Sequence, residues 1–390
     1  MAVKVRKIRL GIQVIILILV TVAGILHQEI GGGPDGVASI HAFCPFGGVE
    51  SFYSLVTRGE FIKKTFYSNI ILVGGSTFLV IILGRIFCGW ICALGTLQDI
   101  FGKIGLKLLK KRYYIPKSLD SILRYLKYLI LVVIIYFTWK TGQLVIGSID
   151  PFVAYSHLTA GWEELLNEYL IGLGILIAML LSSLFYDRLF CRYLCPLGAY
   201  YAIIGRFSLL KIKRNKNICV DCKKCDRECP VGLETSSVET VNKGECISCM
   251  TCIESCPTVK KSLEVDIMKK KFNGGKLGVI GVTIFFGIVL ITKGMGLYQT
   301  TPGSLDGIFK GNPKNIRGWM SIEDVAHGFN IPLKKFYKEL GVSMEDLPPE
   351  TTIKSSEEVL KSVGIDFDHD KIDEIIIPIL KEREEKELSK

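Results

Sequence analysis

Apolar residues gather in five long runs along the chain, separated by polar and basic segments. The runs extend over about Leu10–Leu26, Asn69–Phe87, Leu123–Trp139, Tyr169–Phe185 and Leu277–Ile291. A helix needs about 20 mainly apolar residues to cross a bilayer, and each run with its flanks approaches that length. The fifth is the shortest, but neighbouring glycines extend it. The pattern therefore predicts five membrane-spanning helices.

The basic residues predict which helix ends face the cytoplasm. Four Lys or Arg residues precede the first run, and no small-residue cleavage pattern follows it, so we expect an uncleaved helix with a cytoplasmic N-terminus. The loop at 141–167 contains acidic residues but no Lys or Arg, which indicates the outer side. Arg58, Lys63 and Lys64 run against this assignment. The majority predicts a multi-pass protein of the cytoplasmic membrane with an outer C-terminus.

Composition supports a membrane protein. Of the 390 residues 49% are hydrophobic, and the mean hydropathy is +0.36, too high for an ordinary soluble protein. The net charge of +10 comes largely from basic residues beside the apolar runs, which is typical of cytoplasmic membrane flanks. We therefore expect membrane lipid, and no nucleic acid, as a partner.

The strongest chemical signal is a pair of C-x2-C-x2-C-x3-C-P motifs. The first contains Cys219, Cys222, Cys225, Cys229 and Pro230, and the second Cys246, Cys249, Cys252, Cys256 and Pro257. In two-cluster ferredoxins the fourth cysteine of each motif binds the other cluster. We therefore predict two [4Fe-4S] clusters, one on Cys219, Cys222, Cys225 and Cys256 and one on Cys246, Cys249, Cys252 and Cys229. Structural zinc would favour longer spacers, and disulfides would need an oxidising compartment.

A second set of cysteines lies in an internal repeat. Cys88 and Cys92 end the second apolar run, and Cys191 and Cys195 end the fourth at an offset of 103 residues. Cysteines at i and i+4 share one face of a helix, and packing of the two copies about a pseudo-symmetry axis would bring the pairs together. They could hold a further cluster or a soft metal such as Cu(I), act as redox thiols, or pack as small apolar side chains.

The outer loops of the two copies also match. Cys44-Pro45-Phe46 corresponds to Asp150-Pro151-Phe152, with His41 and Glu50 near the cysteine. Cys44 could be a reactive thiol, a ligand or a turn residue. Ionisable groups near a membrane are often proton or ligand sites, so Asp150 is a candidate proton acceptor at an outer quinol site.

These patterns predict a mainly α fold with four parts. They are a membrane helix bundle at 1–215 with two repeated units (about 8–112 and 114–215), an inserted bacterial-type two-[4Fe-4S] ferredoxin domain at 216–266, a fifth transmembrane helix at 267–295, and a small helical extracytoplasmic domain at 296–390. Helical periodicity in the last part covers 322–329, 333–340 and 372–380.

Across 69–267 the sequence resembles the polyferredoxin membrane proteins, which include NapH-type quinol-dehydrogenase subunits, NosR-type regulators and CcoG-type assembly proteins. The resemblance rests on the paired ferredoxin motifs and on C-x3-C-P at Cys191, Cys195 and Pro196. The first copy departs from it, with Ala93 in place of the proline. The resemblance implies one-electron transfer between cytoplasmic clusters and the membrane, often with a quinone.

Three functions follow as hypotheses. The first is an electron-transfer subunit of an oxidoreductase, similar to a quinol dehydrogenase, that passes electrons between a cytoplasmic or quinone donor and a partner redox protein. The alternative is copper reduction and handling, or redox-enzyme assembly, through the C-x3-C cysteines. A redox sensor whose outer domain contacts a partner is a third hypothesis.

Overall fold

The computed structural model describes residues 5–32, 36–58, 62, 65–142, 144–159, 162–241, 244–258, 261–268, 270–300, 316, 318–362 and 376–379. The chain divides into two compact units. The first comprises Met1–Gln28 and Ser39–Thr300, and the second Glu29–Ala38 and Thr301–Lys390. All predicted chemical residues belong to the first unit.

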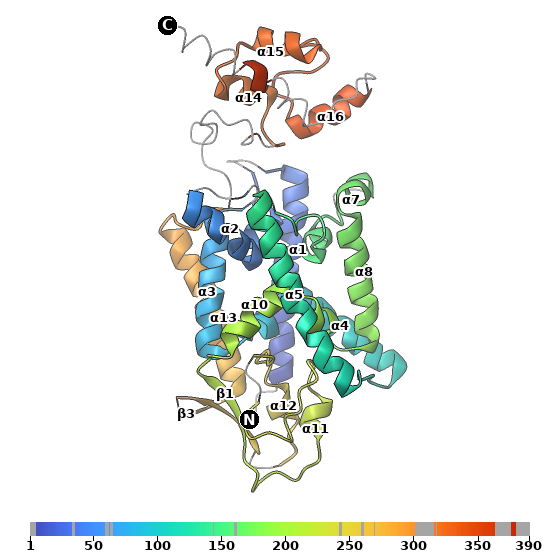
Figure 1. Cartoon of the computed structure of the whole chain (residues 1–390), viewed down its shortest axis with the longest axis vertical. Coiled ribbons are helices and arrows are strands. Elements are labelled where there is room, and N and C mark those ends of the chain that lie inside the picture. Colours follow the sequence, from blue (N-terminus) through green and yellow to red (C-terminus); the bar gives the residue numbers. More distant parts are fainter. Residues whose placement is uncertain are drawn as a thin grey trace. The chain divides into compact units, whose positions relative to one another are not determined.

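Each predicted apolar run forms a helix in the first unit. The helices are α1 (Val5–Ile30), α3 (Tyr67–Leu83), α5 (Lys117–Thr141), α8 (Leu170–Phe185) and α13 (Gly274–Gly294). Among the described residues α1, α5 and α13 are long and apolar enough to cross a membrane, whereas α3 and α8 are shorter apolar helices of 17 and 16 residues. All five are aligned roughly along one direction (Figure 1).

Apolar side chains cover the outer faces of these helices. Ile18 in α1 is 55% exposed, Leu129 in α5 is 61% exposed and Ile171 in α8 is 63% exposed. Water would disfavour this much open apolar surface, whereas lipid would not. The prediction of a mainly α membrane bundle is thus confirmed.

Short helices follow each long one in the same order in both repeated units. The first repeated unit contains a 3-10 turn (Ile40–Phe43) and α2 (Pro45–Arg58). After α3 it contains a π-helical turn η2 (Phe87–Ile91) and α4 (Ala93–Leu109). The second contains α6 (Pro151–Ser156) and α7 (Trp162–Glu168) before α8, then α9 (Leu189–Tyr193) and α10 (Pro196–Gly205). Each C-x3-C pair therefore lies where one short helix ends and another begins.

The ferredoxin motifs lie beside a small antiparallel sheet. Its strands are β1 (Leu210–Arg214), β2 (Leu263–Ile267) and β3 (Lys270–Phe272), in the order β1-β2-β3. Leu210 pairs with Ile267, and Val265 pairs with Phe272. The alternation in β1 points Leu210 and Ile212 into the core. The motifs also contain α11 (Lys224–Arg227) and α12 (Thr251–Ser255), and with the sheet they lie at one end of the long helices (Figure 1).

The second compact unit, Glu29–Ala38 with Thr301–Lys390, has a core of its own. It contains α14 (Ile322–Gly328), α15 (Leu333–Leu340) and α16 (Ile353–Ser362), packed around buried Met320 and Phe336. The first two agree with the predicted helical segments, whereas α16 was not predicted. Residues 372–375 of the third predicted segment lie outside the described residues.

Candidate metal centre

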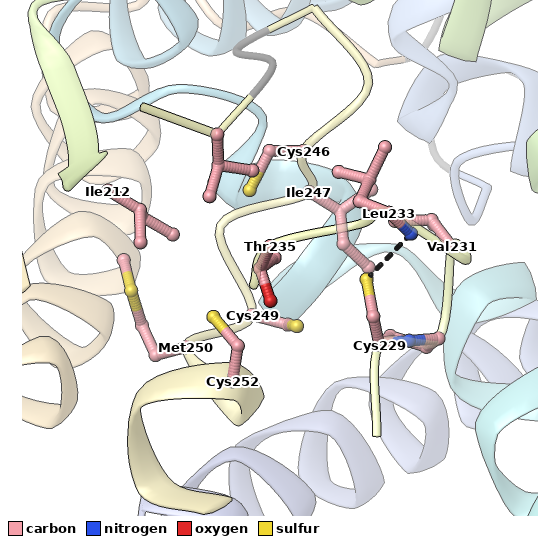
Figure 2. Close-up of a pocket in the computed structure, with 12 residues that line it drawn as sticks. Ile212, Cys229, Val231, Leu233, Thr235, Cys246, Ile247, Cys249, Met250 and Cys252 are labelled. Carbon is pink, nitrogen blue, oxygen red and sulfur yellow. Dashed lines mark hydrogen bonds between the residues drawn. The ribbon is translucent and has the colours of Figure 1, made fainter. Parts of the chain in front are cut away.

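One pocket brings together cysteines of both ferredoxin motifs. Cys229 of the first motif and Cys246, Cys249 and Cys252 of the second line this pocket together with Ile212, Val241 and other apolar side chains. We call these four cysteines the inner quartet. Figure 2 shows them around a common space, with the N–H of Leu233 donating to the sulfur of Cys229 at 3.3 Å.

A second pocket holds the other four ferredoxin cysteines. Cys219, Cys222, Cys225 and Cys256 line this pocket, and we call them the solvent quartet because Cys222 is exposed. The hydroxyls of Thr258 and Ser262 lie 3.1 and 3.2 Å from the Cys256 sulfur. Burial alone would raise the pKa of this thiol, but these hydrogen bonds lower it to about 7.

In the inner quartet, burial outweighs the hydrogen bonds that the sulfurs of Cys229 and Cys246 accept. Burial raises the pKa of Cys229 to about 11 and that of Cys246 to about 12. A metal ion deprotonates the thiols that bind it, so these two would ionise on metal binding.

Left-handed backbone shapes both motifs in the same way. Asp221 and Lys223 flank Cys222 with φ of 48° and 53°, and Ser248 and Met250 flank Cys249 with φ of 50° and 59°. Non-glycine residues rarely adopt this conformation. Alternating right-handed and left-handed residues turn successive N–H groups toward one side and form an anion-binding concavity. Each loop therefore offers backbone donors as well as thiols.

The C-x3-C pairs form a third set, the helix-end quartet. Cys88 lies in η2 and Cys191 in α9, while Cys92 and Cys195 have extended ψ of 121° and 115° and begin α4 and α10. The expectation that each pair occupies one face of a continuous helix is wrong. Pro196 disfavours helical backbone at Cys195, and Cys92 adopts the same conformation before Ala93.

The helix-end quartet converges nonetheless. The Cys195 thiol interacts electrostatically with Cys191, Cys92 and Cys88. Gln98 donates to the Cys191 sulfur at 3.0 Å, and the N–H of Gly198 donates to Cys195 at 3.2 Å. The two repeated units therefore bring four thiols to one place.

The inner quartet packs directly on the η2 turn. A Cβ atom on Gly89 would lie 2.3 Å from the carbonyl oxygen of Ile247, so no side chain fits between them. Trp90 donates from its indole nitrogen to the Ser248 carbonyl at 3.1 Å. The loop between Cys246 and Cys249 is thus in direct contact with the turn that carries Cys88.

Buried ion pairs surround this contact, and sequence reasoning missed their partners. Asp99 accepts two hydrogen bonds from Arg188, both at 2.7 Å, and lies 3.2 Å from Arg9. Burial would raise the pKa of Asp99, but Arg188 and Arg9 lower it to about 2. Glu245 pairs with Lys127 at 2.6 Å and lies 4.0 Å from Arg85. The matching of Arg85 with Arg188 in the repeat was the only sequence signal for these residues.

The outer candidates lie apart from the three quartets. The Cys44 sulfur accepts from the N–H groups of Phe46 and Gly47 at the start of α2, and Asp150 accepts from the Phe152 N–H at 2.8 Å at the start of α6. Cys44 interacts electrostatically with both Asp150 and Glu50. Both predicted residues are therefore helix caps.

Glu50 is the more deeply buried carboxyl of this group. It is 1% exposed and accepts from the Thr138 hydroxyl at 3.1 Å. Burial raises its pKa to about 8 and that of Asp150 to about 6. Its position six residues after Cys44 did not identify it as a site residue.

The donor atoms of all three quartets are thiols, which suit iron-sulfur clusters and other soft metal centres. Within the described part of the chain, no three or more His, Cys, Asp or Glu side chains could hold a single metal ion.

Comparisons with known proteins agree with this chemistry. A family model described as a 4Fe-4S binding domain matches residues 65–113 and 170–217, and one described as a 4Fe-4S dicluster domain matches 211–257. The first two matches cover the two C-x3-C pairs, and the third covers both ferredoxin motifs. No solved structure matches.

Three relatives show the extent of the similarity. YccM of Escherichia coli strain K12, named as a proposed electron transport protein, is 32% identical over 67% of this chain and 75% of its own. The uncharacterized protein MJ0750 of Methanocaldococcus jannaschii is 34% identical over 49% of this chain and 74% of its own. The ferredoxin-type protein NapH of Haemophilus influenzae is 27% identical over 45% of this chain and 59% of its own. The chain therefore belongs to the family of ferredoxin-type [4Fe-4S] electron transport proteins with membrane helices.

Proposed function

We propose that the chain passes single electrons through two [4Fe-4S] clusters, one on the solvent quartet and one on the inner quartet. The observation that carries this proposal is the composition of the two pockets, each of which contains three cysteines of one motif and the fourth of the other. This is the ligand exchange of two-cluster ferredoxins. When bound, such clusters supply reversible one-electron transfer.

The exposure of the two quartets supports a direction through the protein. Cys222 is open to solvent, whereas Cys249 and Cys252 are 8% and 7% exposed and lie beside the η2 turn. A soluble redox partner would dock at the solvent quartet, and the inner quartet would face the membrane domain. The chain then acts as an electron-transfer subunit between a partner redox protein and the membrane.

Several contacts support a cytoplasmic position for the ferredoxin motifs. At the start of α1, the backbone N–H of Arg6 donates to Glu254 and its side chain pairs with Glu228, each at 2.8 Å. The start of α5 reaches the same region through Arg124 and Glu245 at 3.3 Å. Since basic helix ends favour the cytoplasm, this end of the protein faces inward in the cytoplasmic membrane, and the chain leaves α13 on the outer side.

The opposite ends of the helices supply a quinol site in this proposal. Thr138 lies near the last turn of α5, and its partner Glu50 interacts with Asp150 and Cys44. A carboxyl with a pKa near the working pH accepts and releases protons well. Glu50 and Asp150 would take the protons that a quinol releases as its electrons leave, and would supply protons when electrons from the clusters reduce a quinone.

Electron transfer in lipid nanodiscs tests the function. A reduced viologen should reduce a membrane quinone through the wild-type chain, and Cys252→Ser or Cys222→Ser should slow this reaction at least about tenfold because each removes a cluster ligand. Glu50→Gln should slow quinone turnover at least about tenfold, since positioned acids and bases contribute about 10²–10⁴-fold, while viologen still reduces the clusters at the wild-type rate.

The control is Ser343→Ala, which removes an exposed hydrogen bond in the second unit and should leave the rate unchanged. Equal rates in the wild type and in both cysteine variants would overturn the proposal. If Glu50→Gln also slowed the oxidation of viologen, the role of Glu50 in proton transfer would be rejected.

A further inference from the structure

The helix-end quartet lies between two helix N-termini. Cys92 begins α4, which has 17 residues, and Cys195 begins α10, which has 10. The Cys195 sulfur already accepts the N–H of Gly198 at 3.2 Å. The positive ends of two helix dipoles and their free N–H groups favour an anion. Two helix N-termini therefore lie at this quartet, one at Cys92 and one at Cys195.

At the helix-end quartet, each repeated unit packs one buried arginine against the other unit. Arg188 of the second unit donates to the carbonyl of Cys88 in the first at 2.6 Å. A Cβ atom on Gly95 would lie 3.2 Å from its guanidinium nitrogens, and one on Gly198 would lie 3.2 Å from those of Arg85. Each arginine thus packs on the cysteine turn of the other unit, and glycine leaves the room for it.

The charge of Arg85 is only partly matched by protein groups. Its side chain is 2% exposed, and its Nε atom has no hydrogen-bond partner among the described residues. Its nearest carboxylate in an ion pair, Glu245, lies 4.0 Å away and also binds Lys127 and Arg124. Arg85 interacts electrostatically with Cys88 and Cys195. A buried cation in this situation favours a negatively charged group beside it.

The helix-end quartet also lies next to the inner quartet. The η2 turn contacts the loop between Cys246 and Cys249 without an intervening side chain. Arg188 interacts electrostatically with Cys191 of the helix-end quartet and also with Cys249 of the inner quartet. The two sets of thiols therefore share a charged neighbour.

We infer that Cys88, Cys92, Cys191 and Cys195 together hold a third [4Fe-4S] cluster, shared between the two repeated units, with Arg85 and Arg188 as its counter-charges. A cluster bound by four thiolates is an anion, which the arginines and the two helix ends stabilise. This inference rests on the proposed function and extends it from the ferredoxin motifs into the membrane domain. It also explains why a 4Fe-4S domain model matches twice, at 65–113 and 170–217, because each match supplies two ligands.

Iron and acid-labile sulfide counts of anaerobically purified chain test the inference. Three cubanes give about twelve irons per chain, and Cys191→Ser or Cys88→Ser should give about eight. Cys44→Ser, a matched cysteine change outside the quartets, should keep about twelve. A wild-type count of about eight, unchanged by Cys191→Ser, would overturn the inference.

A second design gives a positive signal. The double variant Cys222→Ser with Cys252→Ser should retain about four irons and a visible cluster absorbance, and adding Cys191→Ser should remove both, while circular dichroism reports that helix content is unchanged. Loss of all iron in the double variant with unchanged helix content would also contradict the third cluster. Stoichiometric Cu(I) binding that depends on Cys191, with about eight irons in the wild type, would assign the quartet to copper instead.

The two proposals fail in different ways. The proposed function fails if Cys222→Ser and Cys252→Ser leave the iron count unchanged. The third cluster fails if only Cys88→Ser and Cys191→Ser leave it unchanged.

Discussion

The solvent quartet and the helix-end quartet each offer four thiols, but in different electrostatic surroundings. Around the solvent quartet, the carboxylates of Asp221 and Asp226 lie 3.5 and 3.7 Å from cysteine sulfurs. Around the helix-end quartet, Arg85 and Arg188 are buried beside the thiols. Reduction adds negative charge to a cluster, so nearby acids lower its potential and nearby cations raise it.

With a cluster in each quartet, as proposed above, these charges would give the solvent cluster a lower potential than the helix-end cluster and would favour electron transfer toward the membrane domain, with the inner quartet between them. Neighbouring charges would set this difference in potential, while the ligand type stays constant. Substitutions of these charged residues should therefore have large effects where the side chains are buried and small effects where they are exposed.

Asp99→Asn should give the largest effect on the buried side. It leaves Arg188 and Arg9 buried without their carboxylate, and breaking a buried pair in this way typically costs about 3–5 kcal/mol. Urea unfolding in detergent should show this loss. Since the pKa of Asp99 is lowered to about 2, its stabilisation is present above the unfolded pKa of about 4 and is lost as the pH falls toward 2. An unchanged unfolding midpoint would show that Asp99 does not balance these arginines.

Gly89→Ala should weaken the contact between the membrane domain and the inner quartet. The added Cβ would meet the Ile247 carbonyl at 2.3 Å, and overpacking of this kind costs about 1–3 kcal/mol. The rate of quinone reduction by viologen should fall, because the inner quartet would lie farther from the membrane domain. Gly74→Ala in α3 is the control, because a Cβ there meets nothing within 4 Å and alanine favours helix. Equal behaviour of both variants would reject the close contact.

Arg85→Gln should shift a potential without removing a cluster. A unit charge at about 10 Å in an effective dielectric of about 20 is worth about 1.7 kcal/mol, or about 70 mV for one electron. The potential of the helix-end cluster should fall by roughly this amount in an EPR-monitored titration. Asp221→Asn should raise that of the solvent cluster by less, because the Asp221 side chain is 76% exposed and water and salt screen it. A larger shift from Asp221→Asn would reverse the comparison between the two quartets.

The ferredoxin motifs were the most predictable part of the site. Three cysteines of each group lie within one short loop, and the ligand exchange of two-cluster ferredoxins assigns the fourth. The predicted groups are the same cysteines that line the two pockets, and the ligation itself stays a prediction. The family was also predictable, and the comparisons confirm it. The apolar runs predicted the five long helices because each depends on local composition.

The rest depends on contacts that spacing does not encode. The break at Cys92 has no proline to signal it, and the exchange of Arg85 and Arg188 depends on how the two units pack. Strand β1 was not predicted, since five residues give too little alternation to separate strand from helix. The sequence does not distinguish Glu50 from an ordinary loop residue, because its burial against Thr138 depends on the fold.

EPR of anaerobically purified chain during stepwise reduction tests the central claim most directly. Electron transfer through the solvent and inner quartets predicts two [4Fe-4S] signals that broaden each other as both become reduced, because adjacent paramagnetic centres interact. Colourless protein that contains no acid-labile sulfide and gives no cluster signal on reduction would contradict it.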